Sequence, residues 1–505
     1  MRTCCPYTAT ADGLGASVIA MIEALPEWGV PAEQVLAELR ELRTADLPTH
    51  GGRLFAYVYD PAVPGLDELA RAAYALSAHV NGLDPTAFPS LLAMENALVA
   101  AAGRLLGGGP GTTAPEVVGS VTSGGTESLI LAVKAARDAQ PGVANPRLVI
   151  PATAHAAFAK AAHYLRVGLD VVPVRELRAD PAAMAAAIGP DTVLVVASAP
   201  SYAHGVVDPV SDIAAAAAER GVRCHVDACF GGWVLPYLKR LGADLPAFDF
   251  AVPGVTSISV DLHKYAYAPK GVSVLLHRDA ALRMPQFFAY ADWPGYTMIN
   301  PVISSTRSGG PIAAALATLR HLGDDGYLRL AEQTRDAVRI LGDAVRATDG
   351  VRLFAPPETS VVCLAAEPEV DLFVLADELA ARGWHTQPQL AYGNLPATMH
   401  LTVTAAVAAT ATDFGPDLAA AVAATGARGP VVLPPELLGA AIALTPEQVT
   451  PDLIEGLAAG LGLADGGAGP MAAVNSLLNV APPALREALL AGFLSLLQRP
   501  SWGER

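Results

Sequence analysis

The chain has 505 residues, 52% of them hydrophobic and 16% charged, a length and composition that predict two or three folded lobes and exclude a disordered protein. The net charge of −16 argues against nucleic acid or an anionic membrane as a partner. The five cysteines include no CxxC pair and no signal peptide is recognisable, which predicts a cytoplasmic protein. No apolar run reaches the roughly 18 residues that span a membrane, so no transmembrane helix is predicted.

Two helical segments are predicted ahead of the first strands. Residues 1–60 are expected to form an N-terminal helical arm, because apolar residues recur at helical spacing before an Asp-Leu-Pro sequence interrupts the pattern. Residues 61–110 are also predicted to be helical, with a turn at Asn81-Gly-Leu-Asp-Pro.

The middle of the chain alternates short β-rich runs with Ala-rich helical segments. This alternation predicts an α/β domain at residues 61–320, with a mostly parallel central sheet flanked by helices. The expected strands are residues 148–150, 171–174, 193–197, 224–226, 257–260 and 272–276. Ligand sites in such sheets lie where strands end and loops begin.

The remaining residues, 321–505, are predicted to form a smaller α+β domain with a helical tail. Helices are expected at 312–322 and 327–347, and short strands mixed with helices at 350–430. The tail is predicted to form helices separated by Pro and Gly, including one at 484–497, and it contains no recognisable catalytic motif.

Lysine is rare in this chain, and two lysines lie close together. Only five of the 33 basic residues are lysines, yet Lys264 and Lys270 lie six residues apart in VDLHKYAYAPKG. Arginine carries surface charge equally well but cannot lose its proton and attack a carbonyl, whereas lysine can form a Schiff base. Lys264 therefore indicates a Schiff-base site just after a predicted strand, unless the lysine pair is a compositional accident near a turn, and the neighbouring motifs decide between the two.

A glycine-rich turn precedes the helix expected at residues 129–139. Gly124, Gly125 and Thr126 would offer free N–H groups and the positive end of a helix dipole to a phosphate. The same residues are also typical of an ordinary capped helix. No GxxxxGK[ST] lysine is present, which disfavours a nucleotide P-loop.

Two further polar residues lie at the ends of predicted elements. Asp227 ends a strand, where it could cap or pair, or hold a pyridine nitrogen protonated. His155 starts an Ala-rich helix, where it could stack on an aromatic ring or simply satisfy the helix end. Together with Lys264 and the glycine turn, these residues suit pyridoxal 5′-phosphate. No metal site is predicted, because HExxH and HxH are absent.

Four segments carry a resemblance to a known family: GSVTSGGTESLILAVKAARD, PATAHAAFAKAAHY, HVDACFGGW and GVTSISVDLHKYAYAPKG. They resemble the sphingosine-1-phosphate lyase family, which belongs with the glutamate and aromatic amino-acid decarboxylases among the fold-type I pyridoxal-phosphate enzymes. The resemblance runs from about residue 36 to residue 310 and is weaker beyond. It implies a fold-type I large domain, the cofactor pyridoxal phosphate and a homodimer with a shared active site.

The resemblance also implies a role for each matching residue. Lys264 would bind the cofactor aldehyde, His155 would stack on the ring and Asp227 would pair with its nitrogen. The cofactor phosphate would be held by Gly124, Gly125, Thr126, His263 and Ser305. Substrate contacts would come from Lys270, which matches a phosphate-binding lysine of the family, and from Tyr59, Asn81, Asp84, His204 and Arg307.

Two departures from the family concern the substrate. Asp84 replaces a phosphate-binding histidine, and a carboxylate near a dianionic phosphate costs on the order of 1–4 kcal/mol. Phe55 and Tyr57 are bulky where the family has small residues.

The sequence therefore predicts a lyase that cleaves a sphingoid-base phosphate, or a related β-hydroxy amine, into a fatty aldehyde and phosphoethanolamine. The substrate amine would displace Lys264, a base (released Lys264, or Tyr59) would take the 3-hydroxyl proton, and the Cα–Cβ bond would break. The alternative is an amino-acid decarboxylase on the same fold, which Asp84 favours and Lys270 disfavours. A non-catalytic homologue is disfavoured, because Lys264 is present.

Overall fold

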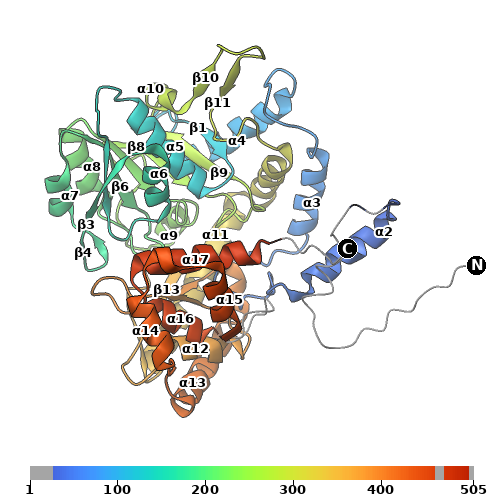
Figure 1. Ribbon diagram of the computed structural model, residues 1–505. Coiled ribbons are helices and arrows are strands. Elements are labelled where there is room, and N and C mark those ends of the chain that lie inside the picture. Colours follow the sequence, from blue (N-terminus) through green and yellow to red (C-terminus); the bar gives the residue numbers. More distant parts are fainter. Residues whose placement is uncertain (1–24, 26, 461–470, 500–505) are drawn as a thin grey trace, which may run out of the picture.

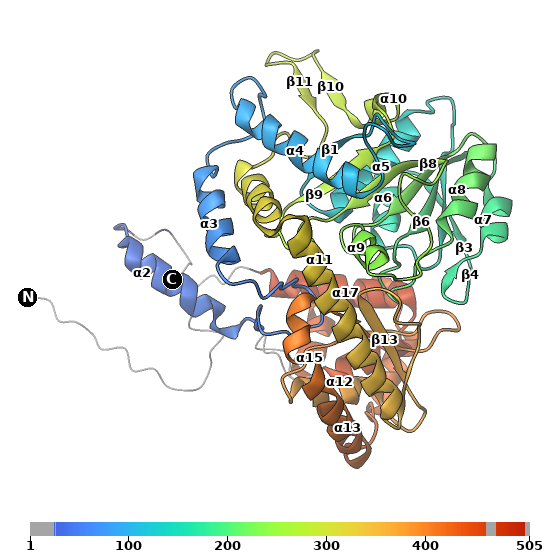
Figure 2. The same cartoon turned by 180° about the vertical axis from the view of Figure 1, so that it is seen from behind.

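The computed structural model describes residue 25 and residues 27–460 and 471–499. The predicted arm and tail fall partly outside these described residues, at 1–24, 26, 461–470 and 500–505. Figures 1 and 2 show a larger part and a smaller part, with one long helix, α11 (Gly309–Ala347), running through both. The backbone of α11 leaves helical geometry at Gly323, between the two helices predicted for this stretch.

The larger part is built on a seven-stranded sheet in the order β1-β9-β8-β7-β6-β2-β3. Its strands are β1 (Val118–Thr122), β2 (Arg147–Pro151), β3 (Gly168–Val172), β6 (Thr192–Ser198), β7 (Arg223–Asp227), β8 (Val255–Val260) and β9 (Ser273–His277). Strands β3, β2, β6, β7 and β8 run parallel, whereas β9 is antiparallel to both β8 and β1. Every residue of β6 is buried, as expected of an apolar strand in a parallel sheet covered by helices. The predicted mostly parallel sheet is confirmed.

Each of the six predicted strands overlaps a strand of this sheet, but the sequence pattern gives no sign of β1. The five residues of β1 include Gly119 and Ser120, so they lack a continuous apolar run. The strand forms because β9 supplies an antiparallel partner along its whole length.

Helices flank the large sheet, and two small hairpins extend from it (Figure 1). The helices are α3 (Leu66–Leu76), α4 (Pro89–Leu105), α5 (Gly125–Asp138), α6 (Ala157–Leu165), α7 (Pro181–Ala187), α8 (Val210–Glu219), α9 (Leu235–Arg240), α10 (Ala280–Arg283) and the 3-10 helix η3 (Met284–Gln286). The hairpins are β4 (Val174–Arg175) with β5 (Arg178–Ala179), and β10 (Phe288–Tyr290) with β11 (Met298–Asn300).

The smaller part contains a four-stranded antiparallel sheet in the order β12-β13-β15-β14. Its elements are β12 (Val351–Leu353), β13 (Val361–Ala366), β14 (Gln387–Gln389), β15 (Thr398–Thr402), α12 (Leu372–Ala380), η4 (Ala405–Ala409) and α13 (Ala411–Arg428). The Asp371 carboxylate accepts the N–H groups of Phe373 and Val374 and so caps the start of α12. The predicted domain boundary at residue 320 stays a prediction.

The C-terminal helices form a layer on the smaller part. They are α14 (Pro435–Ala443), η5 (Pro446–Gln448), α15 (Pro451–Gly460), α16 (Ala472–Val480) and α17 (Pro483–Leu497). A small apolar core joins Ile454 of α15 to Leu485 and Leu489 of α17. Helix α16 packs on α12 through Ala472, so the layer is attached to the smaller sheet domain.

The helical part of the N-terminal arm stands apart from the rest of the molecule (Figures 1 and 2). It consists of α2 (Ala32–Leu42) and the 3-10 helix η2 (Arg43–Ala45), neither of which has a buried residue. The end of the predicted arm is not helical and packs on the smaller part, where Phe55 is fully buried and stacks on Trp384. Leu36 and Leu39 are 50% and 51% exposed, so the apolar face of α2 is uncovered in a single chain. Among the described residues, no helix is long and apolar enough to cross a membrane.

Candidate active site

Seven of the predicted site residues line one cavity of about 440 Å³ in the larger part. They are Gly124, Gly125, Thr126, His155, Asp227, His263 and Lys264. They come from the turn that starts α5, the turn before α6, the end of β7 and the loop after β8. Because parallel strands end at the same edge of a sheet, the topology brings these distant segments together.

The glycine turn at the start of α5 packs closely against Cys229 and Asp261. A Cβ atom on Gly125 would lie 2.8 Å from the Cys229 sulfur and 2.9 Å from an Asp261 carboxylate oxygen, so no larger residue fits without movement. Ser123 donates to Glu127 Oε2 from its N–H (2.6 Å) and its hydroxyl (2.9 Å), which fixes the turn. The helix N-terminus that opens into the cavity favours an anionic group there.

Asp227 and His155 face this cavity from different elements. The Asp227 side chain is buried at the end of β7, and its Oδ1 accepts the N–H of Cys229 at 3.1 Å. His155 Nδ1 accepts the N–H of Ala157 at 3.1 Å, so a neutral ring carries its proton on Nε2. The ring edge contacts Tyr202, with 6.3 Å between the ring centroids.

Lys264 is held by Asp261, a residue that the sequence reasoning missed. Lys264 Nζ lies 2.8 Å from Asp261 Oδ2, and the Ser273 hydroxyl donates to Asp261 Oδ1 at 2.6 Å. Asp261 is 2% exposed, which strengthens its effect on nearby charges. Burial lowers the pKa of Lys264, but the attraction and hydrogen bond of Asp261 outweigh it and raise the pKa above its ordinary value. The signal was the position of Asp261, three residues before the lysine.

Lys270 and Tyr59 lie together beside the cavity. Lys270 Nζ is 5.2 Å from the centroid of the Tyr59 ring, a cation–π distance. Burial and the charge of Lys264 lower the pKa of Lys270. Burial also raises the pKa of the Tyr59 phenol, so this side chain stays protonated and can donate a hydrogen bond. The Tyr59 ring contacts Phe230, which lines the cavity.

Aromatic side chains form one wall of the site, and no sequence motif marks them. Tyr202 and Phe230 line the cavity, and Tyr265 packs edge-on against Phe230 with 5.3 Å between centroids. His400, from β15 of the smaller part, stacks on Tyr202 at 4.5 Å. These contacts depend on tertiary packing between segments up to 200 residues apart, which sequence spacing does not reveal.

His204 lines a neighbouring cavity of about 320 Å³ rather than the one around Lys264. The two cavities share His155 and Tyr202. The His204 side chain is buried, and its Nδ1 has no hydrogen-bond partner among the described residues. Burial lowers the pKa of His204, which keeps the ring neutral near pH 7.

Four predicted residues do not line the Lys264 cavity: Asn81, Asp84, Ser305 and Arg307. Arg307 forms a bidentate ion pair with Glu95, and its carbonyl accepts the N–H of Gly82. Asn81 Oδ1 accepts from Leu83 N–H and lies 3.3 Å from the Thr306 hydroxyl. Ser305 lines a third cavity, next to Lys134.

Asp84 in this group is exposed and folded back on its own turn. Its Oδ1 accepts the Thr86 hydroxyl at 2.7 Å and the Thr86 N–H at 2.8 Å. The hydrogen bond from the Thr86 hydroxyl lowers the pKa of Asp84, so the carboxylate is ionised at neutral pH.

The residues around Lys264 fit pyridoxal phosphate. The glycine turn suits the phosphate, the buried Asp227 carboxylate suits a protonated ring nitrogen and Lys264 suits the aldehyde. Ser198 adds a buried hydroxyl to the same cavity, and this hydroxyl has no partner among the described residues. The cavity therefore offers a polar group for each polar end of the cofactor.

Comparisons with known proteins agree with this chemistry. The pyridoxal-dependent decarboxylase conserved domain matches residues 24–367. Sphingosine-1-phosphate lyase of Arabidopsis thaliana is 36% identical over 417 residues, which cover 81% of this chain and 75% of that protein. The solved structure of Burkholderia pseudomallei sphingosine-1-phosphate lyase is 36% identical with a TM-score of 0.75, and the match covers 82% of this chain and 96% of that one.

The chain belongs to the sphingosine-1-phosphate lyase family. This membership confirms the resemblance seen in the sequence, the fold-type I architecture and the cofactor pyridoxal phosphate, and makes the protein a pyridoxal-phosphate-dependent lyase. The wider family also includes decarboxylases. A Pyrococcus furiosus protein named as a probable L-aspartate decarboxylase is 32% identical over 364 residues, which cover 71% of this chain and 93% of that protein.

A second family match covers the C-terminal helices of this lyase-family chain. Residues 435–496 match the C-terminal HTH domain of pyridoxal-dependent enzymes. This segment contains six acidic residues and one basic residue, Arg486.

Proposed function

We propose that this lyase cleaves the Cα–Cβ bond of a phosphorylated long-chain amino alcohol, a sphingoid-base phosphate, to give a fatty aldehyde and phosphoethanolamine. The relatives from Arabidopsis thaliana and Burkholderia pseudomallei are named for sphingosine 1-phosphate. The observation that carries the proposal is Lys270, a second cation beside Lys264 and Tyr59. An ammonium and a protonated phenol at this distance suit a substrate phosphate.

The residues around Lys264 have distinct roles in this reaction. When bound, pyridoxal phosphate would supply an electron sink for the pair left on Cα, and Asp227 would hold its ring nitrogen protonated. Lys264, as a free amine, would take the proton of the 3-hydroxyl and return it to Cα. Asp261 positions Lys264 and favours its protonated form between these two transfers. Tyr59 acts as a hydrogen-bond donor rather than a base, because its pKa is raised.

The second candidate function is decarboxylation of an amino acid on the same scaffold. The similarity to a protein named as a probable L-aspartate decarboxylase supports it, as does the exposed carboxylate of Asp84 where the family has a phosphate-binding histidine. A decarboxylase breaks the bond from Cα to its carboxylate and has no evident use for Lys270. We therefore place the lyase first.

We also propose that the active site is shared between two copies of this chain in the cytoplasm. The uncovered apolar face of α2 supports a dimer, as does the separation of Asn81 and Arg307 from the cavity of their own Lys264. In a dimer the second copy could place this group at the site. The described cysteines, Cys224, Cys229 and Cys363, are free, which is in keeping with a reducing compartment.

Replacing Lys270 tests the role of the second cation. Lys270→Ala should lower kcat/KM for a phosphorylated sphingoid base roughly tenfold to a hundredfold, because a charge-assisted hydrogen bond contributes about 1.5–3 kcal/mol. Turnover of the unphosphorylated amine should change little. Lys239→Ala, an exposed lysine on α9, is the control. An equal loss for both substrates would refute the assigned role of Lys270.

A further inference from the structure

A larger cavity of about 570 Å³, here called the C-terminal chamber, lies between the smaller sheet domain and the C-terminal helices. One wall comes from α12 and β14, and the other from α15, α16 and α17, with Leu47 and Tyr57 of the arm at the edge. This volume is within the range of small-molecule sites, roughly 300–1,000 Å³. No catalytic residue of the proposed reaction lines the chamber, so it needs its own explanation.

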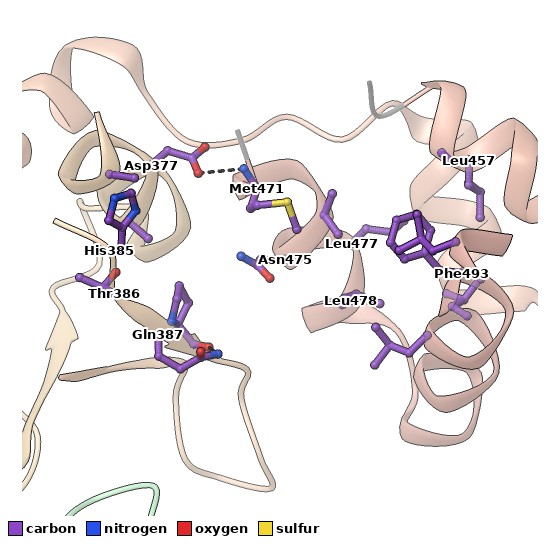
Figure 3. A pocket seen from close by; sticks show the side chains of 18 of the residues that line it. Asp377, His385, Thr386, Gln387, Leu457, Met471, Asn475, Leu477, Leu478 and Phe493 are labelled. Atoms are coloured by element: carbon purple, nitrogen blue, oxygen red, sulfur yellow. Dashed lines mark hydrogen bonds between the residues drawn. The ribbon is translucent and has the colours of Figure 1, made fainter. Parts of the chain in front are cut away.

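The two walls of the chamber differ in chemistry, as Figure 3 shows. His385, Thr386 and Gln387 lie on the sheet-domain wall. Leu457 and Phe493 lie on the helical wall, with further leucines of α16 and α17 around them. A ligand that matches both walls has a polar end and a hydrocarbon body.

The polar end of the chamber is effectively uncharged. Among the described residues that line it there is no Lys or Arg, and burial lowers the pKa of His385, so its ring is neutral at pH 7. Asp377 is the one carboxylate, and it accepts the N–H groups of Met471 at 2.8 Å and Ala472 at 3.1 Å. Its charge is balanced by the start of α16 and by Arg428, which does not line the chamber and whose Nη1 lies 4.0 Å from Asp377 Oδ2. An anionic head group would meet this carboxylate with no Lys or Arg among the described lining residues.

Neutral hydrogen-bonding groups are available at this end. Thr386 Oγ1 is buried and has no partner among the described residues. The Asn475 amide is drawn between the two walls in Figure 3 and lines the chamber together with Gln387. A hydroxyl and two amides can donate hydrogen bonds to a carbonyl or hydroxyl oxygen.

The chamber lies next to the proposed active site along two separate segments. Tyr57 lines the chamber, and Tyr59 contacts Lys270 two residues later. Gln387 of β14 lines the chamber, and Gln389 of the same strand lines the His204 cavity, which shares His155 and Tyr202 with the Lys264 cavity. Residues two apart in a strand lie about 6.6–6.8 Å apart, so the chamber neighbours the His204 cavity and reaches the Lys264 cavity through it.

We infer that the C-terminal chamber binds a molecule with a single long hydrocarbon chain and an uncharged oxygen head group, and that in this lyase the molecule is the fatty aldehyde product. The identity of the aldehyde rests on the proposed function, whereas the ligand chemistry rests on the chamber itself. The substrate and phosphoethanolamine both carry a phosphate, whereas the aldehyde is uncharged. The aldehyde is therefore the one of these three molecules that matches the uncharged chamber. Holding the aldehyde there keeps its carbonyl away from the amine of Lys264.

The ligand class can be measured with hexadecan-1-ol, an unreactive analogue of the aldehyde, and hexadecyl phosphate as its anionic counterpart. Equilibrium dialysis of the full-length cofactor-loaded protein should show one hexadecanol per chain and binding of hexadecyl phosphate at least about tenfold weaker. Lys264→Ala should bind hexadecanol as the wild type does. Because Lys264→Ala should have no activity, hexadecanol binding by this variant tests the chamber independently of the proposed reaction.

Two matched pairs of variants locate the binding. Leu490 lines the chamber and Leu494, one turn later on α17, does not, although both are about half exposed. Leu490→Trp should weaken hexadecanol binding at least about tenfold and Leu494→Trp less than about twofold. Asn475→Arg places a cation at the polar end and should raise the affinity for hexadecyl phosphate, whereas Ser476→Arg, outside the chamber, should not.

Several outcomes would overturn the inference. They are the absence of saturable hexadecanol binding, equal affinity for the alcohol and its phosphate, or the same effect of Leu490→Trp and Leu494→Trp. A change in sedimenting mass for Leu490→Trp with unaltered hexadecanol binding would instead show that a second copy of the chain covers this face.

Discussion

Asp261 connects the phosphate turn to the catalytic lysine. Its carboxylate lies against Gly125 on one side and pairs with Lys264 at 2.8 Å on the other, while Ser273 and His263 approach from the remaining sides. This buried carboxylate stays ionised, because the charge of Lys264 and the hydrogen bonds from Lys264 and Ser273 offset the cost of its burial and lower its pKa. Asp261 is therefore a positioning residue that also sets the protonation of Lys264.

Asp261→Asn tests this role without changing the size of the side chain. The amide cannot stabilise the Lys264 ammonium, so the pKa of Lys264 should fall. Capture of pyridoxal phosphate by the apoprotein requires the neutral amine, so the pH midpoint of its rate should shift downward when followed by absorbance. The exposed Asp212→Asn on α8 is the control. An unchanged midpoint in the Asp261 variant would show that the ion pair does not govern Lys264.

The sequence predicts those site residues that belong to rare residue types and lie at the ends of strands or helices. Lys264, Asp227, His155 and the glycine turn each follow or precede a strand or helix that could be recognised. Asp261 does not stand out in the sequence because acidic residues are common, and its role follows from its burial beside Lys264. Tyr202 and His400 meet only through the packing of the two sheet domains, which no local pattern encodes.

At the scale of elements, the start of α5 is the part of the fold that requires glycine. The turn rests on Cys229 and Asp261, so its backbone approaches the floor of the cavity more closely than a side chain allows. Burial also explains which strands can be predicted from the sequence. Long apolar runs such as β6 are recognisable in the sequence, whereas β1 is specified by its pairing with β9.

Gly125→Ala tests the packing of this turn. The added methyl group should lower the free energy of unfolding by about 1–3 kcal/mol, as overpacking does, and weaken the binding of pyridoxal phosphate by displacing the turn. Gly142→Ala, where nothing lies within 4 Å of the new Cβ, is the matched control. Urea unfolding and a cofactor titration measure both effects. Full retention of cofactor affinity in Gly125→Ala would exclude the turn as the phosphate site.

At the scale of the whole molecule, the single chain presents its predicted substrate residues in two groups. Lys270 and Tyr59 lie near Lys264, whereas Asn81 and Arg307 lie elsewhere, between α3, α4 and the start of α11. The exposed apolar face of α2 adds a second surface that a partner would cover. A dimer that exchanges these elements would account for both features.

Mixing two inactive variants tests the shared site. Lys264→Ala lacks the cofactor lysine, and Asn81→Ala should be slow because a substrate contact is lost. If Asn81 serves the other subunit, hybrid dimers contain one intact site, and a co-refolded equimolar mixture should regain about a quarter of wild-type activity. Activity equal to the sum of the separate variants would place Asn81 and Lys264 in the same chain's site or remove Asn81 from it.

Analysis of the reaction products tests most directly which bond this enzyme breaks. The purified cofactor-loaded protein should release a long-chain aldehyde and phosphoethanolamine from a sphingoid-base phosphate, release no CO₂ from amino acids including L-aspartate, and lose all activity in Lys264→Ala. Release of CO₂ from an amino acid without any aldehyde from the sphingoid-base phosphate would contradict the lyase assignment and establish the decarboxylase in its place.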